Sequence, residues 1–247
     1  MAKRSVCRRP HCVLACLMAC GGFPTLAQGA LYSHTLNTSL SPVDPANGYQ
    51  YFAFNSPLTV DQVFTTTGGV ITSNTMGNGF QGQGSNYVYK EVLPAQFEPG
   101  NDWEVSARVR VLESESVSFL FGFFLGGWFD GIAAGVGLTH NAWQYYSLAG
   151  SGSRDNREWT DWRILTDRAS NTYEVFVDNQ LLFTDNLIAA NGSPGFGLPV
   201  NHVLFGDGTG GSNARAEISS FAFRQVPTPG GTAAFMMLGA LGTRRRR

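Results

Sequence analysis

Two glutamates, Glu113 and Glu115, come closest in this sequence to a pair of catalytic carboxylates. Residues two apart in a β-strand point to the same face, and two carboxylates about 5 Å apart can serve as nucleophile and acid/base in glycoside hydrolysis. The local sequence, Glu-Ser-Glu-Ser, is also typical of a solvated strand end or turn, which we favour. We therefore assign no catalytic residue and keep the two glutamates as candidates for an enzymatic alternative.

Other catalytic chemistries have no matching motif. The four cysteines all lie within the first 20 residues, and the chain contains neither a His-Glu-x-x-His zinc motif nor a Gly-x-Ser-x-Gly nucleophile turn. We expect His34, His140 and His202 to lie in loops. The sequence thus favours binding over catalysis.

Aromatic side chains are the better functional candidates, because a flat apolar ring with a polar edge suits the face of a pyranose. Trp128 in "GGWFDG", together with Trp143 and Tyr145 in "HNAWQYY", flanks predicted loops. We take these three residues as the carbohydrate-binding candidates. Trp162 lies in an alternating segment, and we expect it to be buried.

Calcium is the cofactor that the sequence favours. Ca²⁺ prefers carboxylate and carbonyl oxygens, and the loop "GDGTGG" offers Asp207 together with backbone oxygens. Asp130 and Asp185 could add ligands only if the fold brings them close. The alternative is a tight glycine-rich turn before the last strand.

The segments that must position these residues alternate with period two, which predicts β-strands with one buried face. In "WEVSARVRVLE", Val105, Ala107, Val109 and Val111 share one face. The run "VSFLFGFFLG" is almost entirely apolar and predicts a strand covered on both faces. We expect the glycines in and after this run to mark bends or bulges.

A hairpin is the clearest unit: strands 162–166 and 172–177 are followed by a tight Asp-Asn turn and a third strand, 180–183. Further strands are predicted at 203–205 and 214–223. The segments "YEVFVDNQLLF" and "FGDGTGGSNARAEISSFAF" resemble concanavalin A-like and laminin G-like jelly rolls, where Asp-Gly is usual at the tight turn. Related glucanases carry Glu-x-Asp-x-Glu, which this sequence lacks. The predicted fold is all-β, an antiparallel two-sheet β-sandwich spanning residues 30–225.

Charge argues against nucleic acid as a partner. Of the 17 Lys and Arg residues, four lie near each end, so the middle of the chain carries 9 against 18 Asp and Glu, a net charge near −9. Nucleic acids and anionic lipids require clustered cations. Neutral sugars or bound cations are better matched to this domain.

Both ends carry the features of export signals. Residues 1–29 read as a signal peptide, with basic residues before a short apolar stretch. Residues 226–247 contain a proline motif, an apolar run too short to span a bilayer easily, and an arginine cluster. Together the ends resemble PEP-CTERM proteins, although Thr228 replaces the family's acid. The residues that carry this predicted sorting signal are Val226, Pro227, Pro229, Arg244, Arg245, Arg246 and Arg247.

The resemblance implies transient attachment to the inner membrane, cleavage by an exosortase-type membrane protease, and release to the cell surface or extracellular matrix. An ordinary tail anchor is the alternative. We expect an exported carbohydrate-binding or adhesive module with an extracellular polysaccharide as partner. A structural matrix protein and, third, a glycan-cleaving enzyme remain open.

Overall fold

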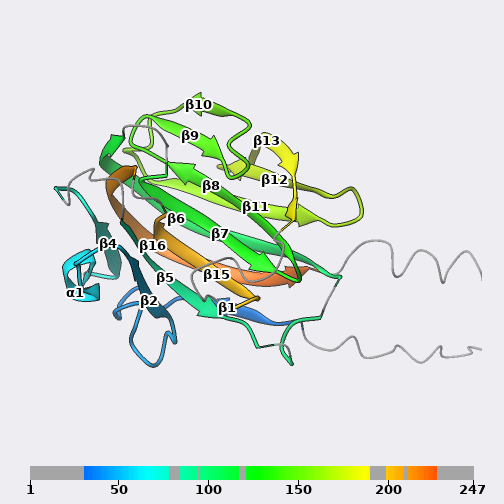
Figure 1. The fold of residues 1–247 in the computed structure, drawn as a ribbon, viewed down its shortest axis with the longest axis horizontal. Helices are drawn as coiled ribbons and strands as arrows, with labels where there is room; N and C mark the ends of the chain where they lie inside the picture. Colours follow the sequence, from blue (N-terminus) through cyan, green and yellow to red (C-terminus); the bar gives the residue numbers. More distant parts are fainter. Residues whose placement is uncertain are drawn as a thin grey trace, which may run out of the picture. The chain divides into compact units, whose positions relative to one another are not determined.

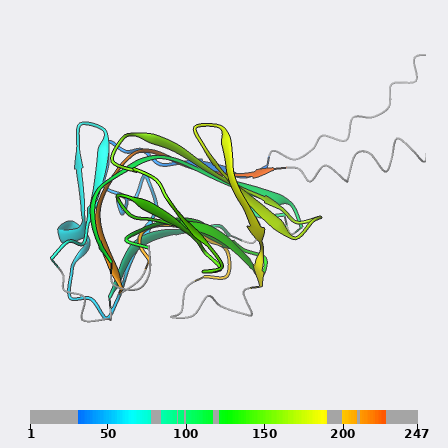
Figure 2. The ribbon, with the colours of Figure 1, turned by 90° about the horizontal axis from the view of Figure 1, so that it is seen from above.

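Two antiparallel sheets lie face to face in the computed structural model (Figures 1 and 2). The structure describes residues 31–77, 84–93, 95–98, 100–116, 121–189, 199–208 and 211–226. Within these ranges the only α-helix is the single turn α1 (Val60–Val63). The fold is therefore the predicted all-β sandwich.

Sheet A contains eight described strands, one of which, β1, pairs with β16 beside the main path. In spatial order the strands are β13 (Gln180–Asn186), β12 (Thr172–Val177), β11 (Thr160–Asp167), β6 (Asp102–Ser116), β16 (Ser212–Val226), β4 (Val70–Asn74) and β3 (Phe64–Thr67), with β1 (Ser33–Thr35) at the side.

Sheet B also contains eight described strands, and β14 pairs with β8 beside the main path. In spatial order they are β10 (Ser151–Ser153), β9 (Ala142–Tyr145), β8 (Ile132–Leu138), β7 (Phe123–Phe129), β15 (His202–Asp207), β5 (Ser85–Glu91) and β2 (Gln50–Phe54), with β14 (Ile188–Ala189) at the side.

Strand β6 shows how the alternating sequence builds the sandwich. Its predicted inner residues Val105, Ala107, Val109 and Val111 are each at most 4% exposed. On the outer side Arg108 pairs with Asp161 of β11. One face of the strand is thus buried against the opposite sheet, and the other face carries charged residues. This alternation is usual in an antiparallel sheet that has one face on the core and one face in water.

The predicted hairpin is confirmed. Strands β12 and β13 are joined by Asp178 and Asn179, whose φ angles are 50° and 65°. Both residues thus adopt the left-handed region that a two-residue hairpin turn requires, which Asn and Asp tolerate. Trp162 of β11 is 2% exposed, as expected.

Aromatic rings fill the space between the sheets. Phe129 of β7 stacks on Phe223 of β16 with 4.6 Å between ring centroids, and Phe205 of β15 contacts Phe221 of β16 at 4.7 Å. Each pair joins one sheet to the other. This core fixes which side of every strand points outward.

Strand β7 is covered on both faces, as its apolar sequence predicts. The expectation that nearby glycines mark bends or bulges is wrong for Gly126, Gly127 and Gly135, because β7 and β8 pair in continuous register. These glycines instead make room for aromatic rings, since a Cβ at Gly127 would lie 2.8 Å from the Phe129 ring.

The predicted signal peptide and all of the sorting tail except Val226 lie outside the described residues. Val226 is the last residue of β16 and pairs with Asp102. No helix within the described ranges has the length and apolarity that a membrane crossing requires.

Candidate functional site

The outer face of sheet B carries a second aromatic cluster, separate from the core. Residues of β5, β7 and β15 that alternate with core residues point to this side. We call the cluster the sheet B aromatic face. It comprises Phe52, Tyr87, Tyr89, Phe121, Phe124, Trp128, Tyr146, His202 and Leu204.

The rings form a continuous series across three strands and the turn that follows β9. Tyr89 contacts His202 at 6.0 Å, and the His202 ring stacks on Trp128 at 5.4 Å and 14°. Trp128 meets Tyr146 edge-on at 5.0 Å, and Tyr146 contacts Phe124 at 5.2 Å. Such contacts hold the rings in fixed positions, as a rigid binding platform requires.

Glycines support this face from below. The Phe124 ring lies over Gly126 and Gly135, where an added Cβ would collide with it. Gly206 has a φ of 133° and leaves room for Tyr87, whose Cα would lie 2.7 Å from an added Cβ. Without side chains on these positions the large rings can lie flat along the sheet.

One buried polar side chain, His202, lies within the aromatic cluster. His202 is fully buried, its Nδ1 donates to the Pro199 carbonyl at 2.7 Å, and burial lowers its pKa to about 4. The imidazole is therefore neutral at pH 7, and its Nε2 has no hydrogen-bond partner among the residues that the structure describes. None of the nine residues that make up the face is Lys or Arg.

Of the three predicted sugar-binding residues, only Trp128 lies on this face. The rings of Trp143 and Tyr145 pack on the inner side against Phe183, at 4.8 and 4.2 Å. Gly152 and Gly150 cover them, because an added Cβ would lie 2.5 Å from the Trp143 ring and 2.7 Å from the Tyr145 ring. These two residues close the sandwich between β9 and β13.

Asp207, the predicted calcium ligand, lies in a strand and not in a loop. It is the last residue of β15, fully buried, and its charge raises the pKa of Tyr51 after the larger effect of burial. Asp130 binds Arg168 at 2.8 Å, and Asp185 accepts from Tyr173 at 3.2 Å. Among the described residues no three His, Cys, Asp or Glu side chains gather as a metal site would need.

A β-bulge decides where the two glutamates point. Val111 pairs with Ala216 but Glu113 pairs with Arg215, so β6 contains one extra residue, Leu112. The bulge turns Glu113 to the outer side of sheet A, where it binds Arg215 at 3.1 Å. Glu115 lies two residues further along the same outer side.

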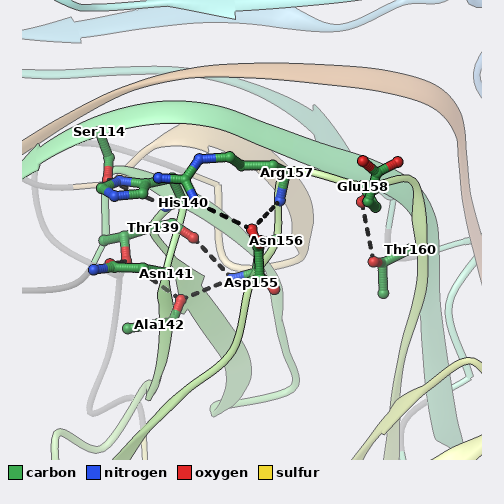
Figure 3. A network of polar contacts seen from close by, with 10 residues as sticks. All are labelled: Ser114, Thr139, His140, Asn141, Ala142, Asp155, Asn156, Arg157, Glu158 and Thr160. Atoms are coloured by element: carbon green, nitrogen blue, oxygen red, sulfur yellow. Dashed lines mark hydrogen bonds and ion pairs between the residues drawn. The ribbon is translucent and has the colours of Figure 1, made fainter.

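The same bulge turns Ser114 toward the interior, where it meets a polar network (Figure 3). Ser114 Oγ lies 2.7 Å from His140 Nδ1 and accepts from the His140 backbone N–H at 3.2 Å. Asn156 donates to the carbonyls of Thr139 and Ala142 at 2.8 and 2.9 Å. The network fastens the β8–β9 turn to β6.

Burial and the neighbouring Arg157 lower the pKa of His140. No carboxylate in the described part of the chain hydrogen-bonds its imidazole, so the Ser114–His140 contact has no orienting acid. Of the three histidines expected in loops, only His140 is in a turn, whereas His34 and His202 lie in strands.

Sequence reasoning missed most of the aromatic face. Phe124 and Trp128 stand two strand periods apart in "FFLGGWF", which is a usable signal once the inner side of β7 is known. The contributions of Tyr87, Tyr146 and His202 depend on strand pairing that no local pattern reveals.

No protein family model and no curated protein matches the chain. Among solved structures, lectin I-B4 from Griffonia simplicifolia is 9% identical, with a TM-score of 0.48 over 79% of this chain and 99% of that one. A carbohydrate esterase from Shiga toxin-encoding bacteriophage phi24B is 14% identical, with a TM-score of 0.48 over 77% and 96%. The VIP36 exoplasmic/lumenal domain, bound to Ca²⁺ and Man3GlcNAc, is 13% identical, with a TM-score of 0.43 over 82% and 92%.

Proposed function

We propose that this chain is a carbohydrate-binding protein and that the sheet B aromatic face is its binding surface. The observation that carries the proposal is the second aromatic cluster, on the side of sheet B away from the core. Its rings Phe52, Tyr89, Trp128 and Tyr146 are half-buried and keep part of their surface exposed, whereas its other five residues are at most 7% exposed. Rings fixed by mutual contacts offer flat apolar area to a sugar ring at little cost in side-chain entropy.

Charge supports a neutral ligand. The face contains no Lys or Arg, and Glu91 lies beside it, opposite His202 in the pairing of β5 with β15. A polysaccharide rich in carboxylate or sulfate would meet no cation on these residues and would be repelled by Glu91. A neutral polysaccharide of the extracellular matrix suits the surface better.

Glycan cleavage is not part of this proposal. A glycosidase needs two carboxylates facing each other across a bound sugar, about 5 to 10 Å apart. Glu113 is engaged by Arg215 on the outer side of sheet A, and it stands beside Glu115 on the same strand. The aromatic face lies on the other sheet.

Binding to a glycan array by the purified chain tests the proposal. Trp128→Ala should weaken binding to the retained neutral glycans by about tenfold or more, because it removes the central ring of the series. Trp159→Ala is the matched control, since Trp159 is a half-buried tryptophan that packs on Arg110 of sheet A at 4.7 Å. Retention of no glycan, or equal losses in both variants, would contradict the proposal and favour a structural matrix protein.

We also propose that the protein is exported and that an exosortase-type protease removes the C-terminal sorting tail, residues 226–247. The basic leader and the final arginine cluster support this. Mass spectrometry of secreted protein should show loss of Arg244 to Arg247. An intact C-terminus in the medium would contradict the sorting step.

A further inference from the structure

The outer side of sheet A contains a polar depression of about 270 Å³, which lies over the neighbouring strands β11, β6 and β16. We call it the sheet A depression. The five side chains that line it are those of Ser106, Asp161, Arg163, Asn179 and Ser220. All five residues are exposed or half-buried, so the depression is open to solvent.

Strand pairing creates the depression. Ser106 of β6 lies between Arg163 of β11 and Ala222 of β16, so two small side chains stand next to each other on the outer side of the sheet. A β-bulge at Ser219 of β16 keeps Ser220 on this side as well. Because most of these residues belong to paired strands, the backbone ladder fixes their positions.

The two charged side chains of the depression are held by partners outside it. Arg163 lies over the Phe176 ring at 4.0 Å and 3.6 Å from the buried carboxylate of Glu104. Asp161 accepts from Arg108 with both oxygens, at 3.1 and 3.2 Å. The Arg163 and Asp161 side chains are nevertheless 32% and 57% exposed. Each keeps hydrogen-bonding positions for a ligand, since a guanidinium has several N–H donors and a carboxylate several acceptor sites.

The charges around the depression favour an uncharged ligand. A carboxylate, sulfate or phosphate bound at Arg163 would lie near Asp161 and Glu104, which repel it. An amine bound at Asp161 would lie near Arg108 and Arg163. A hydroxyl group meets neither obstacle, because it accepts from the guanidinium and donates to the carboxylate.

The other three side chains fit the same ligand chemistry. Ser106 and Ser220 provide hydroxyls, and Asn179 provides an amide at the β12–β13 turn. These groups both donate and accept hydrogen bonds, as the hydroxyls of a sugar do. The volume is slightly below the ~300–1,000 Å³ of pockets that hold drug-sized ligands, so it suits a single sugar ring.

We propose that the sheet A depression is a second binding site, which takes one neutral sugar unit and hydrogen-bonds its hydroxyl groups between Asp161 and Arg163. The site lies on the opposite sheet from the sheet B aromatic face and does not depend on it. With both sites, one domain would bridge two glycan chains, and this bridging alone rests on the proposed function.

Nuclear magnetic resonance of the full chain with methyl glycosides of neutral hexoses tests the site. Titration up to about 20 mM should give saturable shifts of the backbone amide signals of Ser106, Asn179 and Ser220, with a Kd in the millimolar range. Ser106→Val should raise this Kd about tenfold or more, because the added methyl groups occupy the floor of the depression.

Asn179→Gly provides a second variant, which should raise the Kd about threefold by removing one hydrogen-bonding group. Both variants should fold, since valine is favoured in strands and glycine suits the φ of 65° at Asn179. Ser153→Val is the matched control, because Ser153 is an exposed strand residue of β10 in sheet B. It should leave the Kd unchanged, and so should Trp128→Ala.

Three results would overturn this inference: no saturable shift at the depression with any methyl glycoside, saturation by glycine or sodium acetate in place of a sugar, or equal binding by wild type and Ser106→Val. Loss of the sugar-induced shifts in Trp128→Ala would also overturn it and leave the proposed function standing. Shifts at the depression that persist while the glycan array shows no effect of Trp128→Ala would support this site and contradict the proposed one.

Discussion

The buried imidazole of His202 combines one hydrogen bond with one unused nitrogen. Its Nδ1 donates to the Pro199 carbonyl, and Nε2 has no partner within the described ranges. The ring itself contacts those of Tyr89 and Trp128. A second histidine, the half-buried His34, also has a pKa lowered to about 4, mainly by burial. Two neutral histidines in one small domain make its stability depend on pH.

We expect the free energy of unfolding to fall as pH drops from about 6.5 toward 4. The pKa of His202 is about 4 in the folded chain against 6.5 for the free group, so the unfolded state takes up the proton first. The contribution of the neutral His202 to the free energy of unfolding is fully present above pH 6.5. It is lost as the pH falls below that value, by up to about 1.4 kcal/mol per pH unit.

Urea unfolding of wild type and His202→Phe at several pH values measures how much His202 contributes to the pH dependence of the free energy of unfolding. The variant's stability relative to wild type should rise steadily as pH is lowered below 6.5. Parallel stability curves for the two proteins would show that His202 does not titrate in this range.

We also expect the stability of the domain to be sensitive to a substitution of Gly135. In Gly135→Ala the new Cβ would collide with the Phe124 ring and lie 2.7 Å from the Leu125 carbonyl oxygen. We expect a loss of about 1 to 3 kcal/mol in stability and weaker glycan binding, because Phe124 must move. Chemical denaturation checks the first effect, and Gly84→Ala, whose Cβ would lie 3.2 Å from Ser56, should cost less.

Among the elements, the β12–β13 turn permits a graded test. Because Asn179 has a φ of 65°, Asn179→Gly should raise stability by up to about 1 kcal/mol, and Asn179→Ala should lower it by about 1 kcal/mol. Thermal unfolding of the wild type and the two variants measures the order of their stabilities. Gln180→Ala, at the adjacent exposed strand position, should change little, and an alanine variant as stable as wild type would contradict the turn assignment.

Several elements of the second half of the chain were predictable because one face of the strand is buried and the other is exposed to water. The alternation around Val105 and the hairpin ending at Val177 read correctly, because side-chain period two follows directly from strand geometry. The bulge at Leu112 was not predictable, since the pairing of β6 with β16 creates it. Uninterrupted alternation would have turned Glu113 inward.

The sheet B aromatic face was only partly predictable for the same reason. The sequence identified Trp128 as a binding candidate but grouped it with Trp143 and Tyr145, which point inward. Which side of a strand faces the core depends on its partners in the opposite sheet. Tyr87 and Phe124 share a face only because both pair with Gly206.

At the scale of the whole domain, the two sheets present different chemistry to their surroundings. Sheet A carries ion pairs on its outer side, including Arg110 with Glu217 at 2.7 Å and Arg224 with the buried Glu104 at 3.0 Å. Sheet B carries the aromatic cluster on its outer side. The two sheets therefore differ in the chemistry of their outer sides.

This asymmetry predicts a salt response. Raising NaCl from about 50 to about 500 mM should change the Kd for a neutral glycan by less than about twofold, because the aromatic face contains no cation to be screened. Calorimetric titration at the two salt concentrations measures the effect. A loss of tenfold or more would point to an anionic ligand held elsewhere.

The pairing of the first strand with the last has a mechanical consequence. Ser33 lies opposite Arg224, and the Gln225 N–H donates to the Tyr32 carbonyl at 3.0 Å. Tension applied between the two ends would therefore open β1 from β16 like a zipper, one hydrogen bond at a time. We expect a chain pulled from its two ends to open first at this seam, before the sheet on the other side is disturbed.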